Sequence, residues 1–134
     1  MSTTPFEQLI RAASAQPQLQ RLLFVFTAAE LTEDVTATQR QRFHAGHGGA
    51  LTPVTCVDKD VDELTSFESL AAESRQAGPP WSVVFAAGIS GRDGQPPSSE
   101  LVEGALGRMV ERVRVGRLEG LLALDPAGEA LRFE

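Results

Sequence analysis

The sequence predicts a single α+β domain over residues 1–134, with a mixed β-sheet of about five strands, helices packed on it and a C-terminal β-hairpin. Three observations support this prediction. A continuous apolar run, Leu22–Phe26, is typical of a strand buried on both faces. A stripe of apolar residues at helical spacing follows Ser98. Near the C-terminus, two apolar segments flank the turn sequence Asp125-Pro126-Ala127-Gly128.

The first expected element is a helix that begins after Thr4. Thr4 can cap the helix, Pro5 suits the first helical position, and Glu7 completes a capping box. The apolar residues that follow recur at helical spacing: Phe6, Leu9, Ile10 and Ala13. Gln16-Pro17 ends this helix, and the strand at 22–26 comes next.

Residues 36–45 predict a weaker, polar helix, and Gly46 stands where a left-handed C-cap would lie. Residues 50–57 predict the second strand. Pro53 lacks an N–H group, so this strand lies at a sheet edge or Pro53 is close to its start. Cys56 is expected to be a small, buried hydrophobic residue in the middle of that strand.

The next helix is expected to begin at the acidic end of the second strand. Asp60 and Glu63 have capping-box spacing, and the helical pattern that follows them reaches Ala77. Pro79-Pro80 then separates this helix from a third apolar strand, Trp81–Ile89.

The strongest helix begins at Ser98 or Ser99 and reaches about Val115. Its apolar stripe consists of Leu101, Val102, Ala105, Leu106, Met109, Val110 and Val113. Two short strands, 121–124 and 130–133, then form the closing hairpin, in which Gly128 can take a positive φ.

Composition argues against several classes of protein. The net charge of −6 argues against a general nucleic-acid binder, because such proteins need a basic surface. No apolar run reaches the roughly 18 residues that a membrane span needs, so we expect no membrane partner. The single cysteine excludes an internal disulfide and fits a reducing cytoplasm, where we expect the protein to reside.

Three acidic residues at alternate positions, Asp58, Asp60 and Asp62, match the start of a calcium-binding loop. However, Glu63 stands where that loop requires glycine, and Ser69 stands where it requires a bidentate glutamate. A helix start whose acids complement the helix dipole explains the pattern better. If the three aspartates serve a function, we expect them to form an acidic surface for a protein partner.

Two other patterns bear on metal binding and catalysis. His44 and His47, with Cys56 as a third ligand, lack the spacing and the glutamate of a zinc-protease helix, so we expect no metal. Gly88-Ile89-Ser90-Gly91 resembles a nucleophile elbow, but the next residue is Arg92 and no histidine follows the serine. We therefore expect no serine hydrolase activity, and we expect no cofactor.

The segment from Gly88 to Ser99 remains a candidate anion site. Its ligand-binding residues would be Gly88, Ser90, Gly91, Arg92, Ser98 and Ser99. Glycine N–H groups, a guanidinium and a helix N-terminus are the groups that bind phosphate in proteins. Neither the Walker spacing nor the dinucleotide-binding spacing is present, and a plain flexible loop explains the segment better.

Two segments carry a family resemblance. The first begins with Pro53-Val54-Thr55 and ends with Phe67-Glu68-Ser69-Leu70; the second is Glu119–Pro126, followed by Gly128 and Leu131–Phe133. They resemble the strand–helix motif and the closing hairpin of the N-terminal domain of the enhanced serine sensitivity protein family. In that family the turn more often reads Asn-Pro, so Asp125 is a departure. The resemblance implies an α+β domain with a mixed sheet and brings no catalytic residues.

The chain is also similar to small bacterial proteins that carry the name ribonucleotide reductase subunit alpha. That chemistry requires a redox-active cysteine pair, whereas the chain has one cysteine. A tyrosyl radical requires a tyrosine, and the chain has none. We therefore expect a non-catalytic interaction or regulatory module whose partner is a protein, with a second copy of the chain as one such partner. A small-anion or nucleotide binder is the alternative, and an enzyme is the third possibility.

Overall fold

The computed structural model of the protein describes residues 3–30 and 50–131. Its elements in chain order are α1 Pro5–Ser14, β1 Gln20–Glu30, β2 Ala50–Asp60, the 3-10 turn η1 Val61–Glu63, α3 Phe67–Ala77, β3 Val83–Ser90, α4 Ser99–Arg114, β4 Leu122–Leu124 and β5 Ala130–Leu131. The expected helix at 36–45, with Gly46, His44 and His47, lies outside the described residues. Among the described residues, no helix is long and apolar enough to cross a bilayer.

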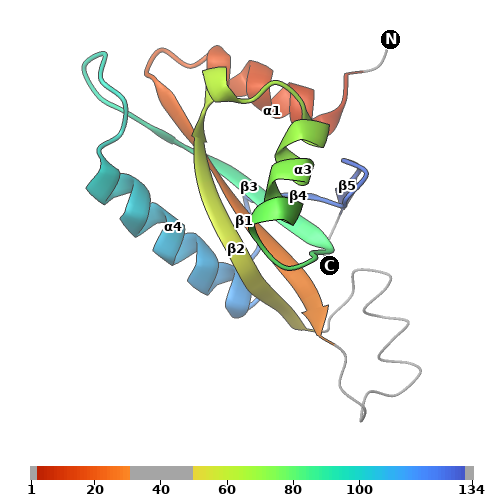
Figure 1. Cartoon of the computed structure of the whole chain (residues 1–134). Coiled ribbons are helices and arrows are strands. Elements are labelled where there is room, and N and C mark those ends of the chain that lie inside the picture. The colour runs from red at the N-terminus through yellow and green to blue at the C-terminus, as the bar shows by residue number, and fades with distance from the viewer. Residues whose placement is uncertain (1–2, 31–49, 132–134) are drawn as a thin grey trace.

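The strands form one five-stranded sheet in the order β2-β1-β3-β4-β5 (Figure 1). The predicted α+β class, the five strands and the C-terminal strand pair are confirmed. Every pairing in the described part of the sheet is antiparallel, so the expected mixed sheet is corrected to an antiparallel one. The reason is the placement of β1. Strands β2 and β3 run in the same direction, but β1 lies between them and is antiparallel to both.

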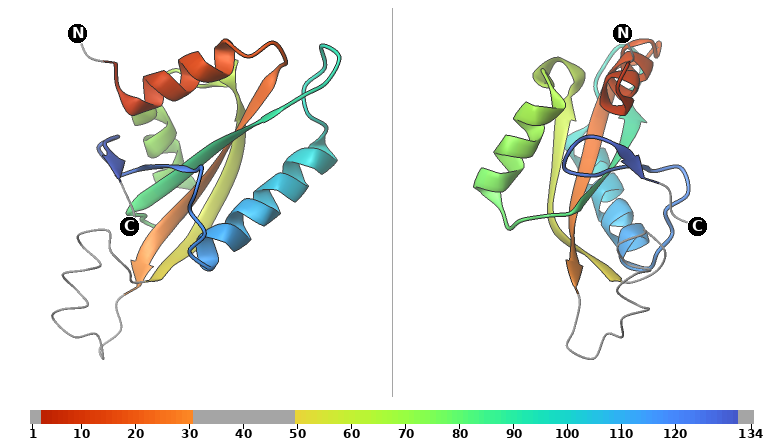
Figure 2. Two further views of the ribbon diagram at one scale, coloured as in Figure 1. Left: turned by 180° about the vertical axis from the view of Figure 1, so that it is seen from behind. Right: turned by 90° about the vertical axis from the view of Figure 1, so that its right-hand side faces the viewer.

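Helices cover both faces of this sheet, with α1 and α3 on one side and α4 on the other (Figure 2). Strand β1 lies second from the edge and is buried on both faces, as its apolar run predicts. Phe24 and Phe26 pack toward α1 and α3, whereas Leu23 and Val25 pack toward α4. Because strand side chains alternate, a strand between two helical layers must be apolar at every position.

Fewer residues of α4 are fully buried than its apolar stripe predicts, and they form a narrower buried line along the helix. Val102, Met109 and Val113 are buried, and the other apolar residues of the stripe are partly buried except Leu101. Leu101 is 45% exposed, which corrects its expected place in the core. It lies in the first turn of α4, at the margin of the buried line.

The chain between β2 and α3 contains two capped helix starts, whereas the sequence predicts one. The Glu63 carboxylate accepts the N–H of Asp60 at 2.9 Å, so the expected capping pair forms, but it closes only η1. Leu64 is extended, and a second cap follows: Ser66 Oγ accepts the N–H of Ser69 at 3.0 Å. Helix α3 therefore begins at Phe67, later than the capping spacing of Asp60 predicts.

The C-terminal hairpin forms as its turn sequence predicts. Gly128 has φ of 86°, and its N–H donates to the carbonyl of Asp125 at 2.9 Å. The Asp125 side chain also closes the turn, because Oδ1 accepts the N–H groups of Ala127 and Glu129. An asparagine side-chain oxygen could accept the same two bonds, so either residue type suits this turn position.

Candidate functional site

The acidic end of β2 is held by an arginine that sequence reasoning missed. Arg21 of β1 lies opposite Asp60 in the strand register. Its Nε contacts Asp58 Oδ2 at 2.6 Å, and its Nη1 contacts Asp60 Oδ1 at 2.7 Å and Glu63 Oε1 at 3.6 Å. Two of the three side chains that match a calcium loop in sequence, Asp58 and Asp60, therefore converge on a guanidinium. We call Arg21, Asp58, Asp60 and Glu63 the Arg21 cluster.

The hydrogen bond from Arg21 to Asp60 is the main reason that the pKa of Arg21 lies above its ordinary value. Partial burial opposes this shift, and the bond and charge of Asp58 add to it. The acidic junction is thus partly neutralised within the protein. Asp62 belongs to η1 and is exposed, and in the described part of the chain its side chain has no ion pair or hydrogen bond.

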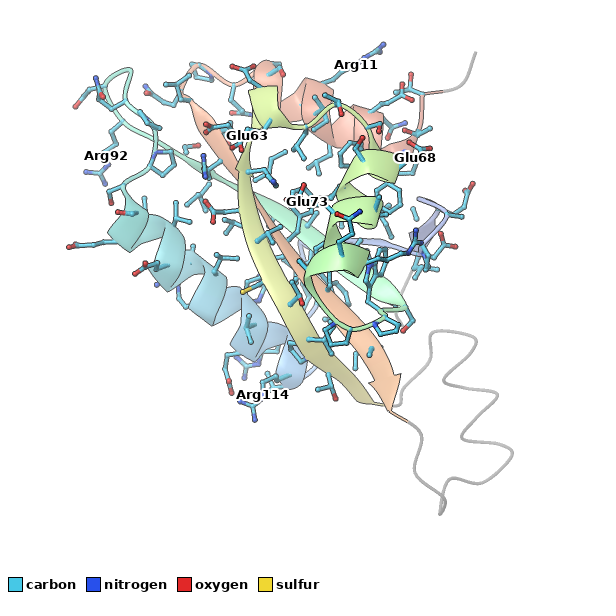
Figure 3. All side chains as sticks on the ribbon, viewed as in Figure 1. Arg11, Glu63, Glu68, Glu73, Arg92 and Arg114 are labelled. Carbon is cyan, nitrogen blue, oxygen red and sulfur yellow. The ribbon has the colours of Figure 1, made fainter. Side chains whose placement is uncertain are left out.

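A second ion pair ties β2 to the opposite helical layer. Lys59 Nζ lies 2.7 Å from Glu73 Oε1, and Glu73 projects from α3 toward β2 (Figure 3). Because Lys59 and Asp58 are neighbours on a strand, their side chains point to opposite faces. The charges on β2 therefore lie on the two faces of the sheet, and its outer edge presents backbone.

The direction of the backbone groups of β2 follows from strand alternation. The N–H of Gly91 donates to the carbonyl of Leu19 at 2.8 Å, so odd-numbered β1 residues direct their backbone groups toward β3. Even-numbered residues such as Phe24 then face β2, and their partners on β2 face back. Cys56 and Asp58 alternate with those partners, so their N–H and C=O groups point away from the sheet.

Two further observations agree with this geometry. The N–H of Asp60, which also points outward in this pattern, donates to the Glu63 side chain rather than to β1. Pro53, which has no N–H, lies just before a register shift that leaves Val54 as the extra residue of a β-bulge. β2 is an edge strand, which confirms one of the two explanations that the sequence offered for Pro53. Proline is tolerated on an edge strand because its missing N–H is not needed for pairing there.

Cys56 is exposed, which corrects its expected burial. The sequence position in mid-strand was correct, but the strand lies at the edge of the sheet. A side chain on an edge strand has strand neighbours on one side only, so Cys56 keeps an open side although α4 packs against β2. Cys56 lies opposite Val25 and shares its α4-facing side of the sheet.

The candidate anion loop is a tight turn that uses its own backbone donors. The N–H of Arg92 donates to Gln95 O at 3.1 Å, and the N–H of Gln95 donates to Arg92 O at 2.8 Å. Asp93 and Gly94 both have positive φ, which is typical of the type I′ turn that Asp-Gly favours. That dipeptide was a sequence signal for this turn. Gly91 also has a local role, because a Cβ there would lie 1.8 Å from Gln95 O.

The side chains of the same segment either form hydrogen bonds within the protein or point in different directions. Ser90 Oγ accepts Gln20 Nε2 at 2.7 Å, and Ser98 Oγ accepts the N–H of Leu101 at 3.2 Å as the cap of α4. Arg92 projects from the turn away from the body of the domain (Figure 3), and Ser99 is exposed in the first turn of α4. Gly88 lies within β3 opposite Leu22. The anion site stays a prediction, with fewer open donors than the sequence offered.

A pocket of about 380 Å³ lies between the starts of α1 and α3 and the β4–β5 turn. Phe6 and Phe67 form part of its lining, with their ring centroids 5.6 Å apart. Three glutamates and one arginine also line it: Glu7, Glu68, Glu129 and Arg11. The pocket is therefore a surface groove lined by apolar side chains and by charges of both signs. Among its lining residues we assign no acid–base pair and no nucleophile.

In the described ranges 3–30 and 50–131, no group of three or more histidine, cysteine or acidic side chains is placed to hold a metal ion. The features that remain for function are the long edge of β2 and the acidic side chains at its end. Comparisons of the chain with models of known protein families, with curated protein sequences and with solved structures gave no match.

Proposed function

We propose that this protein is a non-catalytic interaction module that binds a protein partner along the outer edge of β2. The observation that supports the proposal is the long outer edge of β2. β2 has eleven residues and, within the described sheet, pairs only with β1. A long edge strand is a template for pairing with another chain, and strand addition is a recurring mode of peptide recognition.

The two halves of the β2 edge differ in how they are protected. Pro53 and the bulge at Val54 interrupt the first half, and proteins use both devices to prevent strand pairing. The second half, Thr55–Asp60, is regular, and Cys56 and Asp58 direct backbone groups outward from it. Its lysine is occupied by Glu73 and lies on one face. We infer that this half is the part available to a partner.

Asp58 and Asp60 lie in the C-terminal part of this regular half and Asp62 follows it, so in the proposal the three form an acidic border that selects the partner. Because Arg21 compensates two of them, the border carries less repulsion than three free carboxylates would. We propose a cytoplasmic location for the module, because an exposed thiol such as Cys56 stays reduced there.

The proposal is tested by capture of partners from the native host with two variants at one position. Cys56→Pro removes an outward N–H and leaves the bonds to β1 in place, whereas Cys56→Ser keeps that N–H. We expect the partners captured by the natural protein to be retained by Cys56→Ser and lost by Cys56→Pro, with both variants folded by circular dichroism. Equal capture by the two variants would contradict binding along this edge.

A further inference from the structure

We propose that the partner of this edge is a second copy of the chain, bound through antiparallel pairing of β2 with its own counterpart around a two-fold axis at Val57. The inference rests on the proposed function and names the partner. Two identical edges can pair with themselves only in antiparallel registers, because a two-fold axis reverses the strand direction. The register is then fixed by the position of the axis.

The outward backbone groups select that position. Cys56 and Asp58 are the two residues of the regular half whose N–H and C=O groups point outward and are not used by a side chain. An axis at Val57 places Cys56 of each copy opposite Asp58 of the other. Both pairs are then hydrogen-bonded pairs that exchange two bonds each, so both outward residues of each copy are satisfied.

Register shifts toward either end of β2 are less favourable. An axis at Cys56 pairs Asp58 with Val54 of the bulge, where the regular ladder ends. An axis at Asp58 sets two carboxylates directly opposite each other and pairs Cys56 with Asp60, whose N–H is already bonded to Glu63. The axis at Val57 avoids both problems, because the two Asp58 side chains lie diagonally, roughly 7–8 Å apart.

The Arg21 cluster makes this diagonal approach tolerable. Each Asp58 carboxylate has the Arg21 Nε of its own copy at 2.6 Å, so the two carboxylates do not meet uncompensated. The ion pair also lies on the α4 side of the sheet, beside the outer edge, and leaves the backbone of Asp58 open. The pairing joins the two five-stranded sheets into one continuous sheet.

The size of the contact predicts a weak dimer. A pairing limited to the regular half of β2 buries less than the roughly 1,600 Å² of a standard stable interface. We therefore expect a dissociation constant for the dimer of about 10 µM to 1 mM. Sedimentation velocity over a concentration series can measure it. Cys56→Pro should keep the protein monomeric over that whole series, and Cys56→Ser should not.

Cysteine crosslinking tests the register. At the two-fold axis the two Val57 residues form a non-hydrogen-bonded pair with Cα atoms roughly 4.5 Å apart, within the range of a disulfide. The two Cys56 residues lie diagonally at about 7–8 Å, beyond that range. The probe is the variant Cys56→Ser/Val57→Cys, compared with the natural protein during mild oxidation by diamide, which takes two hydrogens from two thiols as the disulfide forms.

We expect disulfide-linked dimers of the Val57→Cys variant to form about tenfold faster than those of the natural protein. Faster crosslinking through Cys56 would overturn the register, because it places the axis at Cys56. A monomer at every concentration would overturn the self-association. In that case a host partner that is still lost with Cys56→Pro would leave the proposed function standing, so the two failures are distinguishable.

Discussion

The buried hydroxyl of Ser74 offers the sharpest test of how the α3 layer is held to the sheet. Ser74 of α3 accepts the indole N–H of Trp81 at 2.7 Å and donates to the carbonyl of Ala71 at 2.6 Å. Both residues are buried, with exposed fractions of 4% for Ser74 and 8% for Trp81. Ser74→Ala therefore leaves a buried indole N–H without a partner.

The magnitude follows from the cost of an unsatisfied buried donor. That cost is about 1–3 kcal/mol, and with a urea m-value of roughly 1–3 kcal/mol/M it lowers the unfolding midpoint by about 1 M. Ser99→Ala is the matched control, because Ser99 is exposed and its hydroxyl makes no hydrogen bond within the described residues. Its cost should stay within about 0.5 kcal/mol. Urea unfolding followed by far-ultraviolet circular dichroism measures both.

A double-mutant cycle separates the hydrogen bond from the packing of the ring. Trp81→Phe removes the donor, so adding Ser74→Ala to it should cost at least about 1 kcal/mol less than Ser74→Ala alone. If Ser74→Ala cost no more than Ser99→Ala, the proposed role of the Ser74 bond would be refuted.

Ser82→Ala should have the opposite effect on stability. The Ser82 Oγ is buried without a hydrogen-bond partner in the described structure, so this substitution should be neutral or stabilising by up to about 1 kcal/mol.

Three further predictions concern charge, backbone and core. Arg21→Gln should destabilise the protein by about 1 kcal/mol at low salt and by less at 1 M salt in urea unfolding; equal effects at both would contradict an ionic origin. Folding raises the pKa of Arg21, so the stability that Arg21 contributes is fully present below its pKa in the unfolded chain. That stability is lost only as pH rises through the pKa of Arg21 in the folded protein. We therefore expect no change in stability from Arg21 between about pH 6 and 9. Gly128→Ala should lower the thermal midpoint more than Gly94→Ala: both have positive φ, but at Gly128 the new Cβ would also lie 3.2 Å from an aromatic ring of α3, and equal shifts would remove that contact from the argument. Met109→Asp should abolish cooperative unfolding, whereas Leu101→Asp should leave it intact, since only the first side chain is buried against the sheet.

Several elements could be predicted from local sequence because the signals are local. Thr4 and Ser98 cap α1 and α4 as their positions indicate, and the turn at Asp125 closes through its own side chain. The apolar run of β1 predicts burial on both faces, since a strand between two helical layers has no polar side. Each of these features is decided within a few residues, where side-chain chemistry and backbone geometry are directly linked.

The candidate site could not be predicted in the same way. Asp58 and Asp60 are separated from Arg21 by more than thirty residues of chain, and only the β1–β2 register brings them together. Pro53 restricted β2 to two possibilities, and the strand order selected the edge.

The sequence by itself determined the class of fold, the caps of α1 and α4, the turn at Asp125 and the burial of β1, because these depend on short-range chemistry and hydrophobic periodicity. The tertiary structure alone decided that Cys56 is exposed, that Arg21 neutralises the acidic junction, and that β2 presents an outward backbone. The physical reason is that burial and ion pairing at a strand depend on its neighbours in the sheet, and strand order is set by long-range contacts that β-propensity does not encode.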